Sequence, residues 1–249
     1  MYYIGIVVMV AGLFGLIFCA KKQRVNPAMQ SVAYVFALIM FVGLGMSLYD
    51  QMGGGSTADD IENERLFLYS RSAVAGKCLK AANAGKKVLF MTNPNWDKEE
   101  TRKEQVEKQV EAFKSIFGDC DVTIDSIPVP ANFDEEGASI EEVMTVKEFT
   151  ALLAKHPGVQ AIVTDIGLPE KAERLFSKKD APVVFLLSQG NINGKALQKM
   201  FKSGKAVGMI GYKNKADYEK RADEDDLIAS FDIRYTLIDQ NNYTKHQFD

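Results

Sequence analysis

Five residues of this chain are candidates for binding a ligand, because each closely follows an apolar run of the length of a β-strand. They are Asn93, Trp96, Asp165, Ser188 and Gly190. In an open parallel sheet the carboxyl ends of the strands share one edge, and ligands bind beyond that edge. Amide, carboxylate and hydroxyl groups fix the polar atoms of a small molecule, and an indole ring can stack on it. The sequence therefore predicts a ligand-binding site at this edge.

Some of these residues also have a purely structural interpretation. Trp96 is the only tryptophan, and packing over the neighbouring helix would explain it without a ligand. The loop from Ser188 to Gly194 offers backbone N–H groups at a helix N-terminus, which suits an anion. The spacing from Gly190 to Gly194 is too short for a Walker A phosphate loop, and no Ser or Thr follows Lys195.

No motif identifies a reaction, a metal or a cofactor. The chain has two histidines, His156 and His246, which are too few for a histidine-based metal site. The acidic clusters at 134–136 and 223–226 lack the spacing of an EF-hand. Nucleophile-elbow, zinc-protease and paired-cysteine motifs do not occur in the sequence. We therefore expect no cofactor and no metal, and we favour binding over catalysis.

The segments that must hold the candidate residues alternate between strand and helix signals. Short apolar or alternating runs predict strands at 88–91, 121–129, 159–164, 182–187, 206–211 and 233–238. Helical patterns fall at 58–84, 97–117, 145–155, 170–177 and 194–202. Continuous apolar runs are typical of parallel strands that are covered on both faces. This rhythm predicts an α/β fold with a doubly wound, mainly parallel, flavodoxin-like sheet in a three-layer α/β/α sandwich.

Two uncharged apolar runs, 2–20 and 28–49, precede this domain. Each is long enough to cross a hydrocarbon core of about 30 Å as a helix. Basic residues at 21–24 separate the runs, and the positive-inside rule places them in the cytoplasm. We therefore expect residues 1–50 to form a transmembrane hairpin in the plasma (inner) membrane. The N-terminus and the C-terminal domain would then both lie outside the cytoplasm.

A glycine-rich segment, 51–57, predicts a flexible linker to a domain at 58–249. An oxidising compartment permits Cys78 and Cys120 to form a disulfide, whereas an isolated cysteine is more often a small buried hydrophobic residue. Both interpretations stay open. The net charge of −3, without a basic block beyond 21–24, argues against nucleic acid as a partner. The partners that we expect are a lipid bilayer and a second copy of the chain or an envelope protein.

Residues 88–96 (VLFMTNPNW) and 153–163 (LAKHPGVQAIV) carry a family resemblance. They are similar to the first strand with its Asn-Pro-aromatic loop, and to a helix-to-strand junction, in one lobe of the type 1 periplasmic binding proteins. The resemblance runs from Lys87 to about Tyr212 and implies small-ligand binding at the edge that carries the candidate residues. That family closes its ligand between two lobes, and this chain has length for one. A second copy or a partner would therefore have to complete the cleft.

Residues 165–169 (DIGLP) are similar to the phospho-acceptor loop of response-regulator receivers. Ser188 and Lys213 follow the next two predicted strands, where that family places its Ser/Thr and Lys. The acidic pair that holds Mg²⁺ in receivers is replaced here by Thr92 and Asn93. A shared doubly wound topology accounts for both resemblances.

The sequence supports two functions about equally. The first is a membrane-anchored, extracytoplasmic domain that binds or senses a small ligand or a protein partner without catalysis. The second is a structural or assembly component of a membrane complex in the cell envelope. An enzyme of unknown reaction is the third hypothesis.

Overall fold

A computed structural model of the chain describes residues 2–22, 29–51, 58–128 and 140–246. The chain divides into two compact units, Met1–Ile61 and Glu62–Asp249. Apart from Gln51, the predicted linker lies outside the described residues, and so does the acidic cluster at 134–136.

The first unit contains two helices that pack against each other, α1 (Tyr2–Lys22) and α2 (Met29–Gln51). A Cβ added to Gly12 would lie 2.8 Å from the backbone nitrogen of Met40, and one added to Gly15 would lie 2.1 Å from the Phe36 ring. These contacts run in opposite directions along the two helices, which are therefore antiparallel. Among the side chains that the structure describes, no helix is long and apolar enough to cross a membrane. The expected pair of helices is present, and its crossing of a membrane stays a prediction.

The second unit is built on a six-stranded sheet with the order β2-β1-β3-β4-β5-β6. The strands are β1 (Lys87–Met91), β2 (Asp121–Asp125), β3 (Ala161–Thr164), β4 (Val183–Leu186), β5 (Ala206–Tyr212) and β6 (Tyr235–Asp239). The first five strands are parallel, and β6 pairs with β5 in the antiparallel sense. The order of the parallel strands is that of flavodoxin-like sheets. The predicted α/β fold with a mainly parallel sheet is confirmed.

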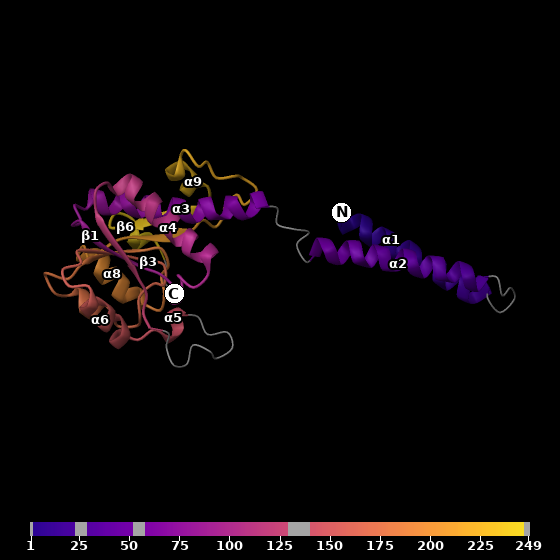
Figure 1. The fold of residues 1–249 in the computed structure, drawn as a ribbon, viewed down its shortest axis with the longest axis horizontal. Helices are drawn as coiled ribbons and strands as arrows, with labels where there is room; N and C mark the ends of the chain where they lie inside the picture. The colour runs from indigo at the N-terminus through magenta and orange to yellow at the C-terminus, as the bar shows by residue number, and fades with distance from the viewer. Residues whose placement is uncertain (1, 23–28, 52–57, 129–139, 247–249) are drawn as a thin grey trace. The chain divides into compact units, whose positions relative to one another are not determined.

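Helices lie on both faces of this sheet, as Figure 1 shows, with α3, α4 and α9 on one side and α6 and α8 on the other. The helices of this unit are α3 (Ala58–Ala81), α4 (Glu100–Phe117), α5 (Ile140–Val143), α6 (Val146–Lys155), α7 (Glu173–Phe176), α8 (Gly194–Lys202) and α9 (Leu227–Arg234), followed by a 3-10 turn, η1 (Tyr243–Lys245). Alternate residues of β1 belong to different apolar clusters: Val88 and Phe90 pack with α3 and α4, whereas Leu89 and Met91 pack with α6 and α8. This alternation is what a strand covered on both faces requires.

Some element ends follow the sequence prediction and others do not. Thr145 and Glu148 form the expected capping box at the start of α6, with the Thr145 hydroxyl accepting from the Glu148 N–H at 3.2 Å. The predicted cap at Asp97 is wrong. Residues 94–97 form a turn with Asn95 in the left-handed region (φ 63°), so α4 begins only at Glu100.

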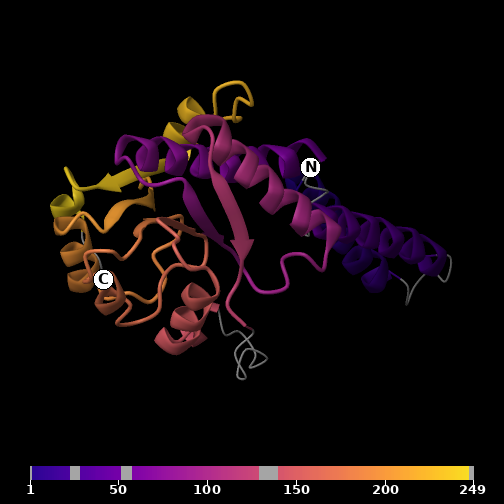
Figure 2. The same cartoon turned by 60° about the vertical axis from the view of Figure 1, so that its left-hand side comes forward.

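Helix α3 is covered on more than one side. It lies beside α4 over one face of the sheet (Figure 2), and a Cβ added to Gly76 would lie 2.5 Å from the carbonyl oxygen of Phe113. Every residue from Tyr69 to Gly76 is buried. A helix that only rests on a sheet buries one stripe of residues. Helix α3 is therefore the central helix of the domain.

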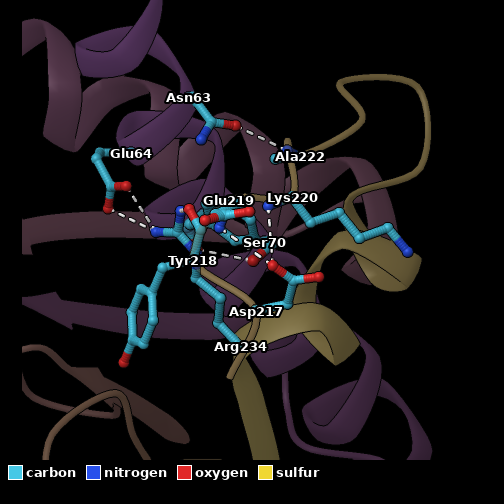
Figure 3. A network of polar contacts seen from close by, with 10 residues as sticks. Asn63, Glu64, Ser70, Asp217, Tyr218, Glu219, Lys220, Ala222 and Arg234 are labelled. Carbon is cyan, nitrogen blue, oxygen red and sulfur yellow. Dashed lines mark hydrogen bonds and ion pairs between the residues drawn. The ribbon is translucent and has the colours of Figure 1, made fainter. Parts of the chain in front are cut away.

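A polar network joins the start of α3 to the C-terminal part of the domain (Figure 3). Arg234 on α9 donates from Nη1 to both carboxylate oxygens of Glu64 at 2.7 Å. Its guanidinium carbon lies 3.6 Å from the centre of the Phe67 ring, which is a cation–π contact. Asn63, which directly precedes Glu64 in α3, accepts from the Ala222 N–H through its side-chain oxygen at 2.7 Å. These contacts fix the rotation of α3 and hence the side from which Arg71 reaches the sheet.

Candidate functional site

A cleft of about 500 Å³ lies at the carboxyl edge of the sheet, beyond β3, β4 and β5. We call it the Arg71 cleft. Its lining residues are Arg71, Asp165, Leu187, Ser188, Gln189, Met209, Ile210, Gly211, Tyr212, Ile238 and His246. Helix α3, three strand ends and the C-terminal segment all contribute, so the cleft forms only in the folded domain.

Arg71 enters the cleft from the buried side of α3 and is 9% exposed. Its Nη2 donates to Asp165 Oδ1 at 3.0 Å and to the backbone carbonyl of Leu187 at 2.6 Å. The guanidinium also lies 5.9 Å from the centre of the Tyr235 ring. Its Nε is buried and has no hydrogen-bond partner among the described residues. A buried charge is stable only when it is paired and its donors are satisfied, and this guanidinium is paired but not fully satisfied.

Asp165 is held opposite Arg71 by two loops that touch each other. The loop after β3 meets the loop after β4 at a parallel bridge between Leu168 and Gly190. Gly167 and Gly190 both lie in the left-handed region, with φ of 63° and 65°. A Cβ on Gly167 would lie 2.4 Å from the α-carbon of Gly190, which is too close for any other residue. The two glycines therefore let the Asp165 and Ser188 loops lie side by side.

Tyr212 lines the cleft at the end of β5 and contacts Tyr235 of β6. Tyr212 is 65% exposed, and its ring meets the Tyr235 ring edge to face at 5.3 Å between centres. Burial raises the pKa of the Tyr235 hydroxyl. His246 follows η1, where Tyr243 stacks on Phe201 of α8 at 5.5 Å between ring centres. That stacking holds the C-terminal segment beside the cleft.

The structure brings together some of the candidate residues but not all. Asp165 and Ser188 both line the Arg71 cleft. Gly190 lies beside them and lines a neighbouring cleft of about 640 Å³ at the start of α8. Asn93 is exposed and Trp96 half-buried on the loop after β1, and neither lines either of these two clefts. The charged residues that line the larger cleft are all exposed among the described residues. The Arg71 cleft, in contrast, has a buried charged residue, Arg71 itself.

The geometry of the Arg71 cleft suits binding better than nucleophilic catalysis. Ser188, His246 and Asp165 line the same cleft, but no hydrogen bond joins any two of them within the described part of the chain. The Asp165 carboxylate is engaged by Arg71 and does not orient a histidine. Nucleophilic catalysis requires the nucleophile and its base within hydrogen-bond reach, and the base held by a third group. Residues with described positions also include no group of three or more His, Cys, Asp or Glu that could hold a metal ion.

Both cysteines of the α/β domain are free thiols in the structure. Burial raises the pKa of Cys78 to about 11, so this thiol is a poor nucleophile at neutral pH. The disulfide between Cys78 and Cys120 that an oxidising compartment permits stays a prediction.

Sequence reasoning missed two lining residues, Arg71 and His246, and also Tyr235, whose ring lies beside Arg71. Arg71 carried a usable signal, since it is the only charged residue between Leu66 and Gly76. A single charge within a small and apolar stretch of a helix indicates a buried ion, which needs a partner elsewhere in the fold. Tyr235 and His246 carried no such signal, because only the turn of the chain around β6 and η1 brings them to this edge.

Comparison of the chain with protein-family models, with characterised proteins and with solved structures finds no match to any of them. The resemblances to periplasmic binding proteins and to receivers therefore stay predictions.

Proposed function

We propose that this chain is a membrane-anchored binding or sensing protein whose α/β domain holds a small polar ligand in the Arg71 cleft without catalysing a reaction. The observation that carries the proposal is a nearly buried guanidinium that lines an open cleft together with the carboxylate of Asp165, to which it is paired. A ligand that brings a hydrogen-bond acceptor to the part of Arg71 that faces the cleft would gain a charge-assisted hydrogen bond there.

The cleft has the size and lining that small-ligand sites have in general. Its volume of about 500 Å³ is within the range of about 300–1,000 Å³ that such sites occupy. Apolar side chains from β5 and β6 form part of the lining, and a few polar groups converge on it: Asp165, Ser188 and Gln189. This combination of an apolar wall with few polar groups gives both burial and orientation.

The membrane anchor is the second part of the proposal, and the two helices of the first unit support it. Large apolar side chains point away from the hairpin, including Phe14 (68% exposed), Leu38 (67%) and Phe41 (64%). Lone apolar residues on a surface are common, but a helix pair that is apolar outside as well as inside suits lipid rather than water. The uncharged runs 2–20 and 28–49 also extend beyond the side chains that the structure describes. With the basic residues at 21–24 in the cytoplasm, the α/β domain would be extracytoplasmic.

The binding part is tested with the full chain in detergent micelles and the variant Arg71→Met. Small polar metabolites are screened by the shift they cause in thermal unfolding, followed by the fluorescence of Trp96. A hydrogen bond to a charged group contributes about 1.5–3 kcal/mol, so we expect Arg71→Met to weaken any bound ligand by about 10- to 100-fold. Arg65→Met is the matched control, because Arg65 lies on the same helix, is partly exposed and does not line the cleft. A ligand whose affinity is the same in both variants would place the site elsewhere.

The anchor is tested by fractionation and thiol labelling of intact cells. We expect the chain to stay with the membrane pellet after washing at alkaline pH, and Cys120 to react with a membrane-impermeant maleimide without lysis. Release into the wash would refute the anchor. Labelling only after lysis would reverse the orientation and place the domain in the cytoplasm.

Assembly of an envelope complex is the alternative function, and one observation favours it. Tyr212 and Tyr218 are 65% and 63% exposed, and exposed tyrosines are enriched in protein interfaces. A partner protein or a second copy seated over them would cover the mouth of the Arg71 cleft, which Tyr212 lines. A chain that purifies from membranes as a monomer without any partner would argue against this alternative.

A further inference from the structure

The charged groups of the Arg71 cleft form a matched pair rather than a single charge. Three ionisable groups other than tyrosine line it: the Arg71 guanidinium, the Asp165 carboxylate and the His246 imidazole. The first two are in direct contact, with 3.0 Å between Nη2 and Oδ1. Their side chains are 11% and 24% exposed, so water screens them only partly. The charges of Arg71 and Asp165 cancel each other.

We infer that the ligand is a small zwitterion of the amino-acid class, an inference that rests on the proposed binding function. Its carboxylate would accept from Arg71, and its ammonium group would donate to Asp165. In an α-amino acid both charged groups are attached to one carbon, so they lie as close together as the two protein charges do. Each charge of the ligand then meets an opposite charge, and the site stays neutral after binding.

The donors and acceptors that such a ligand needs are present. Both of the hydrogen bonds that Arg71 makes within the described part of the chain use Nη2, and none of them uses Nη1. A carboxylate oxygen of the ligand can accept a charge-assisted hydrogen bond from Nη1. Asp165 uses one oxygen, Oδ1, toward Arg71. A carboxylate has about four lone-pair directions, so Asp165 keeps acceptor capacity for an ammonium group.

Singly charged molecules fit the same cleft less well. A simple carboxylate or phosphate near Arg71 would also lie near the negative charge of Asp165 and would be repelled by it. A simple amine near Asp165 would be repelled by Arg71. A neutral sugar could accept a hydrogen bond from Arg71 but would leave the two protein charges without ionic partners in the ligand. A zwitterion is the class of ligand that offers an opposite charge to both Arg71 and Asp165.

The test uses the full chain in detergent with the twenty common L-amino acids as probes, one at a time, by calorimetry and thermal unfolding. For each amino acid that binds, two matched analogues are measured: the amine that lacks the carboxylate and the acid that lacks the amino group. We expect at least one amino acid to bind and both analogues to bind at least tenfold more weakly. Arg71→Lys should weaken the acid-bearing ligands and Asp165→Asn the amine-bearing ones, while Arg65→Met should change neither.

The outcomes separate this inference from the function on which it rests. An amino acid whose deaminated analogue binds equally well would refute the role of Asp165 and hence the zwitterion. A different class of ligand that depends on Arg71, with no amino acid binding, would overturn the inference and leave the proposed function standing. No binding from the amino acids or from the wider metabolite screen would overturn both. The analogue comparison uses the natural chain, so it decides the matter even where a variant fails to fold.

Discussion

The contact between the loops after β3 and β4 predicts that Gly190→Ala is unusually destabilising. Gly190 has φ of 65°, and a Cβ there would lie 2.7 Å from the backbone nitrogen of Leu168 and 3.1 Å from its carbonyl oxygen. An L-residue in the left-handed region costs about 1–2 kcal/mol. Backbone atoms cannot rotate away as a flexible side chain can, so the two loops must also separate, which costs about 1–3 kcal/mol. We therefore expect the free energy of unfolding to fall by about 2–5 kcal/mol.

Gly158→Ala is the control that isolates the contact from the backbone conformation. Gly158 has a similar φ of 80°, but the nearest atom to an added Cβ is Lys87 Nζ at 3.9 Å, at the end of a flexible side chain. This variant should lose about 1–2 kcal/mol from its conformation alone. The difference between the two variants, about 1–3 kcal/mol, is then the part due to the close approach of the loops.

Urea unfolding of the full chain in detergent measures this difference. Trp96 is the only tryptophan and lies in the α/β domain, so its fluorescence follows that domain. Equal losses in Gly190→Ala and Gly158→Ala, within about 0.5 kcal/mol, would refute the contact and with it our account of how Asp165 and Ser188 come together. A selective loss in Gly190→Ala should also weaken ligand binding, because the separated loops carry two lining residues of the cleft.

Three further predictions follow from single sites. Arg234→Met should lower the free energy of unfolding by about 2 kcal/mol through loss of the Glu64 pair and the aromatic contacts; an unchanged urea midpoint would show that these contacts do not stabilise the domain. Thr145→Ala should cost about 1 kcal/mol through loss of the capping box, and Thr145→Ser, which keeps the hydroxyl, should restore most of it. Alkylation of Cys78 should accelerate about tenfold per pH unit from pH 7 to 10, because its pKa is raised to about 11. The folded state holds this proton more tightly than the unfolded chain, so stability should fall as the pH rises from about 9 toward 11; a labelling rate that levels off near pH 9 would contradict the burial of this thiol.

The strands of this domain were predictable because burial on both faces leaves a plain signal in the sequence. The apolar runs at 159–164, 182–187 and 206–211 each contain or closely match a strand of the sheet. Helix α9 was not predicted. Its eight residues include Asp232 and Arg234, which interrupt the apolar pattern, and Arg234 is nevertheless buried because it pairs with Glu64. In the sequence alone, a charged residue whose partner lies far away in the chain looks like a surface residue.

The candidate site was predictable only where it depends on strand ends. Asp165 and Ser188 were predicted from the rule that ligands bind at the carboxyl edge, and both line the Arg71 cleft. Arg71 comes from a helix that precedes the sheet, and its partner Asp165 is 94 residues away. Nothing in either local sequence indicates that pairing. It results from how α3 lies on the sheet, which the contacts with α9 and with the segment before it fix.

The attachment of α3 to late parts of the chain has a consequence for how the domain folds. Its polar contacts reach forward by 116 residues to Leu187, by 159 to Ala222 and by 170 to Arg234. Contacts of such long range make folding slow, since the intervening chain must be ordered before they form. During synthesis α3 emerges before all of these partners, so the part of its surface that they cover stays exposed until residues up to Arg234 have been made. Chaperone binding to the nascent domain should therefore concentrate on α3, and release should coincide with the appearance of α9 and β6.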